Sequence, residues 1–232
     1  MNPDPFFLPT MRFAFLVSGN GGFAKAVYRN MNLLMGAQLV AVVADRECGA
    51  AQYFAENTAI PTSVFPTKEK TPRKEFEEKV VNFFKAQEVN TLFLTFDRLI
   101  SDTLLQAYPG KIFNLHPALL PMFPGCHALS RAWESSTLFS GVTVHLVDAG
   151  VDSGPIVSQV CVSKKMDESE ADFIHRIFCN GAILLIDTIR KLAIKKSQMK
   201  EGQFRFEDVE YGTVPFNPAL SIGLDQFKFW ED

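Results

Sequence analysis

The fold is decided near the start of the chain by one stretch, RFAFLVSGNGGF at residues 12–23. Its first six residues form a short and mainly apolar run, and a loop of serine, glycine and asparagine follows them. After the loop, apolar residues recur at helical spacing as far as Leu34. The stretch therefore predicts a strand, a glycine loop and a helix.

The same order of elements repeats downstream. We expect further strands at residues 39–44, 63–65 and 91–96, separated by helices at 50–56 and 73–85. Strands that alternate with helices in this way predict an α/β fold with a doubly wound, mainly parallel sheet.

Beyond Asp97 the pattern changes. The expected elements are strands at 111–115, 141–147 and 155–163, and helices at about 128–134 and 168–195. The last strand follows a tight connection at residues 152–154, and it should run antiparallel if that connection closes a hairpin. The second half of the fold is therefore expected to be mixed.

Composition narrows the classes of protein. The chain has 232 residues and a formal net charge of −3, and it contains no dense run of Lys or Arg. A chain of this length can bury an ample core as one large domain. Nucleic acids are bound mainly through basic contacts to phosphates, so we expect no nucleic-acid partner.

Cysteine usage and hydropathy favour the cytoplasm. The scattered cysteines at 48, 126, 161 and 179 include no Cys-x-x-Cys pair, so we expect neither a metal site nor a disulfide framework. No apolar stretch approaches the roughly 20 residues that cross a bilayer, and no basic and apolar leader opens the chain. We therefore expect a soluble, cytoplasmic protein without membrane contacts.

The chain is expected to divide into three segments. Residues 1–10 hold three prolines and precede Met11, so we interpret them as a surface arm, with a misplaced start codon as the alternative. Residues 11–200 should form the main domain. Residues 201–232 carry aromatics and prolines with little periodicity, and we interpret them as a C-terminal extension.

The glycine loop is the first candidate site. Free backbone N–H groups at residues 19–22 and the positive end of the following helix would suit a phosphate or a carboxylate. A dinucleotide site would require a third glycine where the chain has Ala24, although Asp45 could serve as its acidic residue. A plain tight turn is the alternative interpretation.

The end of the strand at 111–115 is the second candidate site. Asn114 and His116 alternate along it, so their side chains share one face. Open sheets bind ligands at the carboxyl ends of their strands, where an amide and an imidazole can hold a developing oxyanion. The alternative is a capped strand end whose polar groups only satisfy the backbone.

The turn at residues 148–155 holds two carboxylates, Asp148 and Asp152, and two glycines. A carboxylate beside an imidazole can move protons, so Asp152 and His116 could form an acid/base pair. Asp and Gly also suit a purely structural turn, through local hydrogen bonds and positive φ values.

Together these motifs resemble a known family. The run Asn-x-His-Pro-x-Leu-Leu-Pro-x-x-Pro-Gly at 114–125, with Val144-His145 and the turn at 152–155, is similar to the folate-dependent formyltransferases. Within that superfamily it most resembles the glycinamide ribonucleotide formyltransferases; other members act on methionyl-tRNA, sugar nucleotides or hydroxyornithine. The resemblance covers about residues 11–195 and implies a Rossmann-like fold.

The resemblance implies transfer of a formyl group from 10-formyltetrahydrofolate to a primary amine, by direct attack of the amine. Asn114 and His116 would stabilise the oxyanion, while Asp152 would position His116 and manage the proton that leaves the amine. The implied folate-binding residues are Phe96, Asp97, Arg98, Leu99, Ile100, Val147, Asp148 and Val151, and the implied acceptor-binding residues are Gly19, Asn20, Gly21, Gly22 and Phe23.

Several positions depart from the family's pattern on the acceptor side. The glycinamide ribonucleotide enzymes usually carry Ser-Asn in place of Gly22-Phe23, Ser in place of Ala118, and a Glu where an ungapped match gives Asn180-Gly181. Polar contacts to the acceptor are therefore missing. His127 and His145 match positions behind the catalytic groups, or are ordinary turn and core histidines.

The leading hypothesis is a formyltransferase for a small-molecule amine. Glycinamide ribonucleotide, an amino-sugar nucleotide or a hydroxyornithine-type amine could be the acceptor. Two other classes are hydrolysis of 10-formyltetrahydrofolate, which related deformylases perform with an additional regulatory domain, and folate binding without turnover, in which the catalytic residues would be expected to be lost. We do not expect a tRNA acceptor, because the short tail is acidic. A homodimer is one arrangement that we consider.

Overall fold

The opening stretch folds as the predicted strand, loop and helix, with β1 at Arg12–Val17 and α1 at Gly22–Arg29. The helix ends before the predicted Leu34, and a 3-10 helix at Met31–Leu33 follows it. The computed structural model describes residues 10–67 and 72–228, so residues 1–9 of the expected N-terminal arm lie outside it. Phe13 to Val17 are fully buried. A strand that is buried on both faces reads as a continuous apolar run, which is the pattern of this stretch.

The other elements follow the predicted order. They are β2 (Gln38–Ala44), α2 (Gly49–Asn57), β3 (Thr62–Val64), α3 (Arg73–Ala86), β4 (Thr91–Thr95), α4 (Asp102–Ala107), β5 (Ile112–His116), α5 (Ala128–Glu134), β6 (Phe139–Leu146), β7 (Ile156–Ser163), α6 (Glu170–Ile194), β8 (Ser197–Lys200), β9 (Gln203–Phe206) and β10 (Phe216–Asn217), with short 3-10 helices at Met31–Leu33 and Leu224–Gln226. Of these elements, α4 and strands β8 to β10 were not predicted.

The main sheet is mixed, as predicted. Within the described residues it has the strand order β10-β7-β6-β5-β4-β1-β2-β3. Strands β1 to β5 are parallel, whereas β6 is antiparallel to both β5 and β7. The expected hairpin between β6 and β7 is therefore confirmed.

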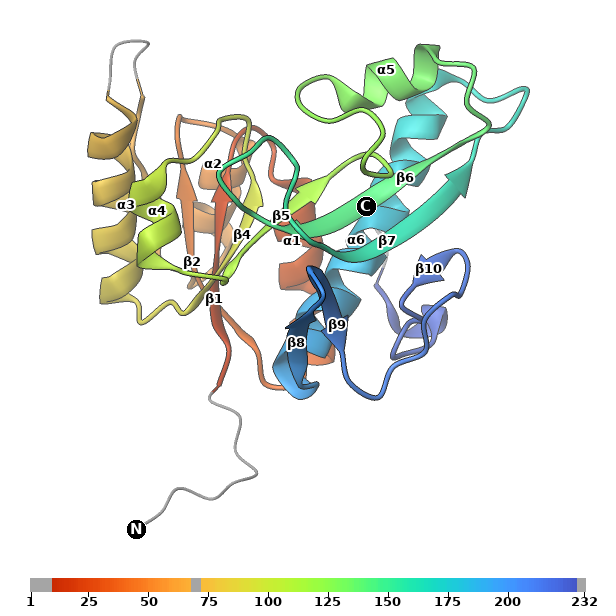
Figure 1. Cartoon of the computed structure of the whole chain (residues 1–232). Helices are drawn as coiled ribbons and strands as arrows, with labels where there is room; N and C mark the ends of the chain where they lie inside the picture. The colour runs from red at the N-terminus through yellow and green to blue at the C-terminus, as the bar shows by residue number, and fades with distance from the viewer. Residues whose placement is uncertain (1–9, 68–71, 229–232) are drawn as a thin grey trace.

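Helices cover both faces of the parallel strands (Figure 1). Phe13 and Phe15 of β1 point into a core shared with α1, α2 and α6, whereas Ala14 and Leu16 point into a core shared with α3 and α4. Alternating residues of one strand feed the two cores, since successive side chains point to opposite faces. The architecture is the predicted doubly wound α/β fold.

The tail contains elements that the sequence did not predict. Strands β8 and β9 pair as a hairpin that lies across residue 200, where we expected the C-terminal extension to begin. Strand β10 pairs antiparallel with β7 and so joins the main sheet. The division of the chain into a main domain and an extension stays a prediction.

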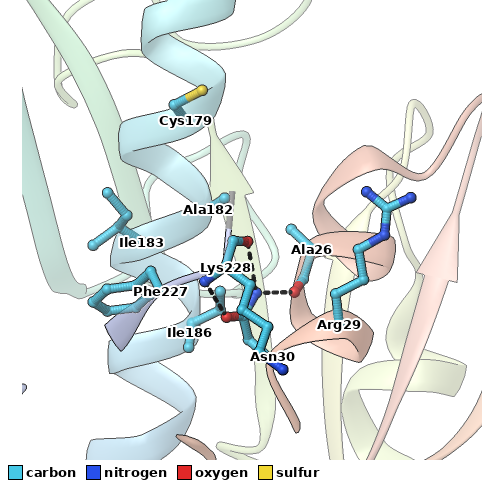
Figure 2. A pocket seen from close by; sticks show the side chains of 9 residues that line it. All are labelled: Ala26, Arg29, Asn30, Cys179, Ala182, Ile183, Ile186, Phe227 and Lys228. Carbon is cyan, nitrogen blue, oxygen red and sulfur yellow. Dashed lines mark hydrogen bonds between the residues drawn. The ribbon is translucent and has the colours of Figure 1, made fainter. Parts of the chain in front are cut away.

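The last described residues of the tail pack against α1 and α6. Figure 2 shows Phe227 and Lys228 lining one small pocket with residues of both helices. The buried Asn30 side chain accepts a hydrogen bond from the Lys228 N–H at 2.7 Å and donates to the Lys228 carbonyl at 3.2 Å. Among the described residues, no helix is long and apolar enough to cross a membrane.

Candidate active site

A cleft lies at the carboxyl ends of β1 and β4, where the connections that follow these two strands turn to opposite faces of the sheet. The chain leaving β1 enters α1 on one face of the sheet, and the chain leaving β4 reaches α4 on the other face. Such a switch point leaves a crevice between the two connections, and open α/β sheets bind their ligands there. The cleft has a volume of about 940 Å³.

Most of the residues predicted for the site line this single cleft. They are the catalytic candidates Asn114, His116 and Asp152, the folate candidates Phe96, Asp97, Arg98, Leu99, Ile100, Val147, Asp148 and Val151, and the acceptor candidates Asn20, Gly21, Gly22 and Phe23. Gly19 is not among the lining residues. Its carbonyl accepts a hydrogen bond from the Ala50 N–H at 3.1 Å, so it anchors the loop to α2.

The cleft has two sides, which belong to opposite faces of the sheet. Phe23 packs against the core that α1 and α6 share, and we call this the α1–α6 side. Phe96, Ile100 and Val147 pack against the core that α3 and α4 share, and we call this the α3–α4 side. Among the described lining residues, the Lys and Arg side chains are Arg73 and Arg98, from the start of α3 and the segment after β4.

The catalytic candidates meet between the two sides. Nδ1 of His116 lies 3.2 Å from Oδ2 of Asp152, and Nδ2 of Asn114 donates to Oδ1 of Asp152 at 3.4 Å. The His116 side chain is 5% exposed and the Asp152 side chain 14% exposed. The structure therefore brings an amide, an imidazole and a carboxylate into contact in a largely water-excluded place.

His145 is a fourth member of this cluster, closer to it than the sequence indicated. Strand β6 pairs with β5 so that His145 lies opposite Asn114, and Nδ2 of Asn114 donates to Nε2 of His145 at 3.2 Å. The same Nε2 lies 3.5 Å from Oδ1 of Asp152. The sequence could have placed His145 beside Asn114 only if an antiparallel pairing of the two strands had been assumed, because the two residues are directly opposite each other in that pairing.

The two carboxylates of the β6–β7 connection have different surroundings. Asp148 accepts hydrogen bonds within its own turn, from the Gly150 N–H at 3.0 Å and the Ser153 hydroxyl at 2.9 Å. Asp152 has a positive φ of 50° and accepts instead from the Gly125 N–H, at 2.7 Å, on the loop before α5. The structural turn therefore uses Asp148, and Asp152 turns toward the catalytic candidates.

Charge is distributed unequally within the cluster. The contact with the His145 ring is the largest cause that lowers the pKa of Asp152, to about 2, and the Gly125 N–H and His116 lower it further. His145 Nδ1 lies 2.8 Å from the Leu146 carbonyl, which can only accept, so Nδ1 carries a proton. The His145 ring can therefore donate to Asp152 only when Nε2 is protonated as well, whereas the Gly125 N–H donates to this carboxylate at 2.7 Å in every state of the ring.

His116 is placed to take up a proton. Burial lowers its pKa below the ordinary value and outweighs the opposing effects of Asp152 and the Phe123 carbonyl. That carbonyl lies 2.8 Å from Nε2 and can only accept, so a neutral His116 carries its proton on Nε2. The unprotonated Nδ1 then faces the Asp152 carboxylate, and a proton added between them would be held by both groups.

A separate network of hydrogen bonds and ion pairs lies at the carboxyl ends of β1, β2 and β4. The buried Asp45 carboxylate accepts hydrogen bonds from the Ser18 hydroxyl at 3.1 Å and from Arg46 Nε at 3.0 Å. Arg46 also pairs with Asp97 at 2.9 Å. Asp45 is thus occupied by protein groups, and the acidic residue that a dinucleotide would use is already hydrogen bonded.

An aromatic pair on the α1–α6 side was not predicted. Phe178 of α6 lines the cleft, and its ring centroid lies 4.8 Å from that of Phe23. The periodicity of α6 identified its buried stripe but gave no reason to single out Phe178. Among the described residues, no group of His, Cys, Asp and Glu side chains is placed to hold a metal ion.

Comparison with known proteins identifies the family. Residues 11–189 match the formyl transferase family. The chain is 38% identical, over 161 residues, to a phosphoribosylglycinamide formyltransferase of Bacillus subtilis, covering 68% of this chain and 82% of that protein. Among solved structures, a glycinamide ribonucleotide transformylase from Geobacillus kaustophilus has a TM-score of 0.75 and 32% identity, covering 80% of this chain and all of that chain.

A phosphoribosylglycinamide formyltransferase from Bacillus halodurans gives a similar result, with a TM-score of 0.74, 30% identity, and coverage of 78% of this chain and 94% of that one. The matched residues include β1, the glycine loop, the catalytic candidates on β5 and the β6–β7 connection. With its doubly wound sheet and the cleft at its switch point, the chain therefore belongs to the formyl transferase family.

Proposed function

We propose that the protein transfers a formyl group from 10-formyltetrahydrofolate to a primary amine of a small molecule. The observation that carries the proposal is the contact of Asn114, His116 and Asp152 in a cleft with two distinct sides. One side can hold the donor and the other the acceptor, with the reacting carbon between them. Membership of the formyl transferase family supports the reaction class.

The α3–α4 side suits the folate. Leu99, the neighbour of Ile100 on this side, is large and apolar but 52% exposed, and it lines the cleft. Exposed apolar side chains that gather in a cleft are typical of a ligand site. Arg73 and Arg98 can pair with the carboxylates of the glutamyl tail, because guanidinium groups bind carboxylates in a bidentate manner.

The reaction proceeds by direct attack. The amine nitrogen forms a bond to the formyl carbon, and the formyl oxygen takes up the negative charge. One N–H of the Asn114 amide can turn from its long contact with Asp152, at 3.4 Å, to this oxyanion. The positive charge that His116 gains when it takes up a proton stabilises the oxyanion as well, because such interactions are strong in a buried site. The proton lost by the amine passes to the pair of His116 Nδ1 and Asp152 Oδ2, which lie 3.2 Å apart.

The intermediate then collapses. The bond between the formyl carbon and the folate nitrogen breaks, and the carbonyl forms again on the product amide. The proton held between His116 and Asp152 moves to the folate nitrogen as this group leaves, so the pair acts first as base and then as acid. The enzyme regains its starting charge.

Two acceptors are candidates. Phosphoribosylglycinamide is the first, because the relatives with which the chain shares 32–38% identity are named for it. The second is an amine without a phosphate. The aromatic pair of Phe23 and Phe178 favours it, since these rings stand on the side left for the acceptor.

The test is a formylation assay. The purified protein is incubated with 10-formyltetrahydrofolate and a panel of amines: glycinamide ribonucleotide, an amino-sugar nucleotide and N5-hydroxyornithine. Mass spectrometry should detect one added formyl group on at least one amine, and the Asn114→Ala variant should form no such product. Release of formate without any formylated amine would indicate a hydrolase, and folate binding without either product would indicate a binding protein.

A further inference from the structure

Two phenylalanines and two glycines interlock on the α1–α6 side of the cleft. A Cβ atom on Gly22 would lie 2.8 Å from Cε2 of Phe178. A Cβ atom on Gly181 would lie 3.1 Å from Cε1 of Phe23 and 3.0 Å from Cγ2 of Val142. Neither glycine has a positive φ, so the backbone conformation does not require glycine at either position. The Phe178 ring occupies the space of a side chain at Gly22, and the Phe23 ring and Val142 together occupy that space at Gly181.

The interlocking carries a cost in helix stability. Gly181 is buried in the middle of α6, and glycine in a helix interior is less stabilising than alanine. Gly22 is the first residue of α1, directly after the loop that should meet the acceptor. Glycine at these two positions leaves room for Phe23 and Phe178 to pack against each other, and both rings line the cleft.

The charges of this side disfavour a phosphate. The lining arginines, Arg73 and Arg98, are both on the α3–α4 side, and among the described residues no Lys or Arg lines the α1–α6 side. Backbone N–H groups at the start of α1 could meet an anion, but no cationic side chain accompanies them there. Aromatic rings present negative faces and apolar area, so a dianion beside them loses hydration and gains only the backbone N–H groups as partners.

We propose that Phe23 and Phe178 determine the acceptor specificity of the transfer reaction. The two rings bind the uncharged face of the molecule that carries the amine, and that molecule has no phosphate monoester near the amine. A sugar ring bearing the amine fits this description, because its C–H face packs on aromatic rings. The inference rests on the proposed function, since it assigns the acceptor to the α1–α6 side.

The first experiment isolates the phosphate. The kcat/KM of the protein is measured with glycinamide ribonucleotide and with the matching riboside, which carries the same amine without the phosphate. We expect a ratio below about threefold, whereas even one charge-assisted hydrogen bond to the phosphate would give roughly 10- to 150-fold. A preference for the ribonucleotide of about tenfold or more would overturn the inference.

The second experiment tests the rings. Phe23→Leu and Phe178→Leu keep an apolar side chain but remove the aromatic faces, and Phe178→Tyr keeps the ring. With a methyl 4-amino-4-deoxyglucoside as the probe, both leucine variants should raise KM about tenfold with little change in kcat, and Phe178→Tyr should retain the wild-type KM. Unchanged KM values in both leucine variants would overturn the inference.

A matched control separates this effect from general loss of packing. Phe83 of α3 is half-buried and contacts Phe65 at a ring-centroid distance of 6.1 Å, outside the cleft lining. Phe83→Leu should leave the KM for the amino sugar unchanged. Thermal unfolding of all variants shows whether each one folds.

The failure of the inference can be distinguished from that of the proposed function. If amines are formylated but the ribonucleotide is strongly preferred, or the leucine variants behave as wild type, only the role of the two rings is wrong. If no amine is formylated and no folate analogue raises the melting temperature, both fail together.

Discussion

His116 and Asp152 face each other with Nδ1 and Oδ2 3.2 Å apart, while the other nitrogen of the ring is held by the Phe123 carbonyl at 2.8 Å. Both neighbours of the ring accept hydrogen bonds, yet burial lowers the pKa of His116. The neutral ring therefore lacks one proton that its surroundings could hold. This mismatch gives the pair its proposed capacity to collect a proton during the reaction.

Replacing Asp152 by Asn should lower turnover by a factor on the order of 10² to 10⁴, because an amide cannot take the proton or support a charged His116. Asn tolerates the positive φ of this position, so the backbone should stay in place. The measurement is kcat with any accepted amine. Asp102→Asn, an exposed residue of α4, is the control, and near wild-type turnover in Asp152→Asn would refute the proposed role.

Stability should fall at mildly acidic pH because of His116. Its folded pKa is lowered, so its contribution is fully present above the unfolded value of about 6.5 and is lost as the pH falls below it. Asp152, with a folded pKa of about 2, loses its contribution only at much lower pH. Urea unfolding at pH 7.5 and 5.5 should show a larger loss for the wild type than for His116→Asn. Equal losses would contradict the assignment.

The sequence predicted the parts of the fold that have a strong local signal. Helix α5 was expected at 128–134 and lies at Ala128–Glu134, and the end of β5 presents Asn114 and His116 as the strand period requires. These elements have buried residues at a regular spacing, which is the information that a periodicity argument uses.

The parts that were missed lack such a signal. All four residues of β8 are exposed, β10 has two residues, and α4 has six with one of them buried, so none shows apolar residues that recur at a regular spacing. The contact of His145 with Asp152 depends on strand pairing and on a loop that returns across the sheet. Phe23 and Phe178 are 155 positions apart in the sequence, and their rings come into contact only because α1 packs on α6.

The α3–α4 side of the cleft should respond to folate. A folate analogue with a non-transferable group at the formyl position should raise the melting temperature, since a ligand at 100 times its Kd stabilises by about 2.7 kcal/mol. NAD should have no such effect. Stronger stabilisation by NAD than by any folate would contradict the proposed donor.

A substitution can locate the folate. Leu99→Asp should weaken analogue binding roughly tenfold or more, because burial of a leucine is worth about 1.5–3 kcal/mol. Leu224 is 54% exposed, close to the 52% of Leu99, but lies outside the cleft lining. Leu224→Asp is therefore the matched control, and isothermal titration calorimetry measures both. Equal affinities of the two variants would place the folate elsewhere.

The tail is fixed to α6 by a buried ion pair. Asp187 and Lys191, each with a side chain 2% exposed, form an ion pair one helical turn apart. Asp187 Oδ1 also accepts from the Ser221 N–H at 2.8 Å, and Lys191 donates to the Ala219 carbonyl at 2.5 Å. The pair thus holds residues 219–221 of the tail against the helix, so its loss should affect both charge balance and tail docking.

Lys191→Met should therefore destabilise the protein by about 3–5 kcal/mol, because it leaves the Asp187 carboxylate buried without its cation. The double variant Asp187→Leu, Lys191→Met removes both charges and should be less destabilised than the sum of the two single variants, since a buried pair can be replaced by apolar residues at small cost. Urea unfolding of all four proteins in the cycle measures the coupling. Arg205→Met, an exposed cation of β9, is the control for loss of one positive charge. Additive effects in the cycle, or a loss below about 1 kcal/mol for Lys191→Met, would show that the pair does not hold the tail as its burial indicates.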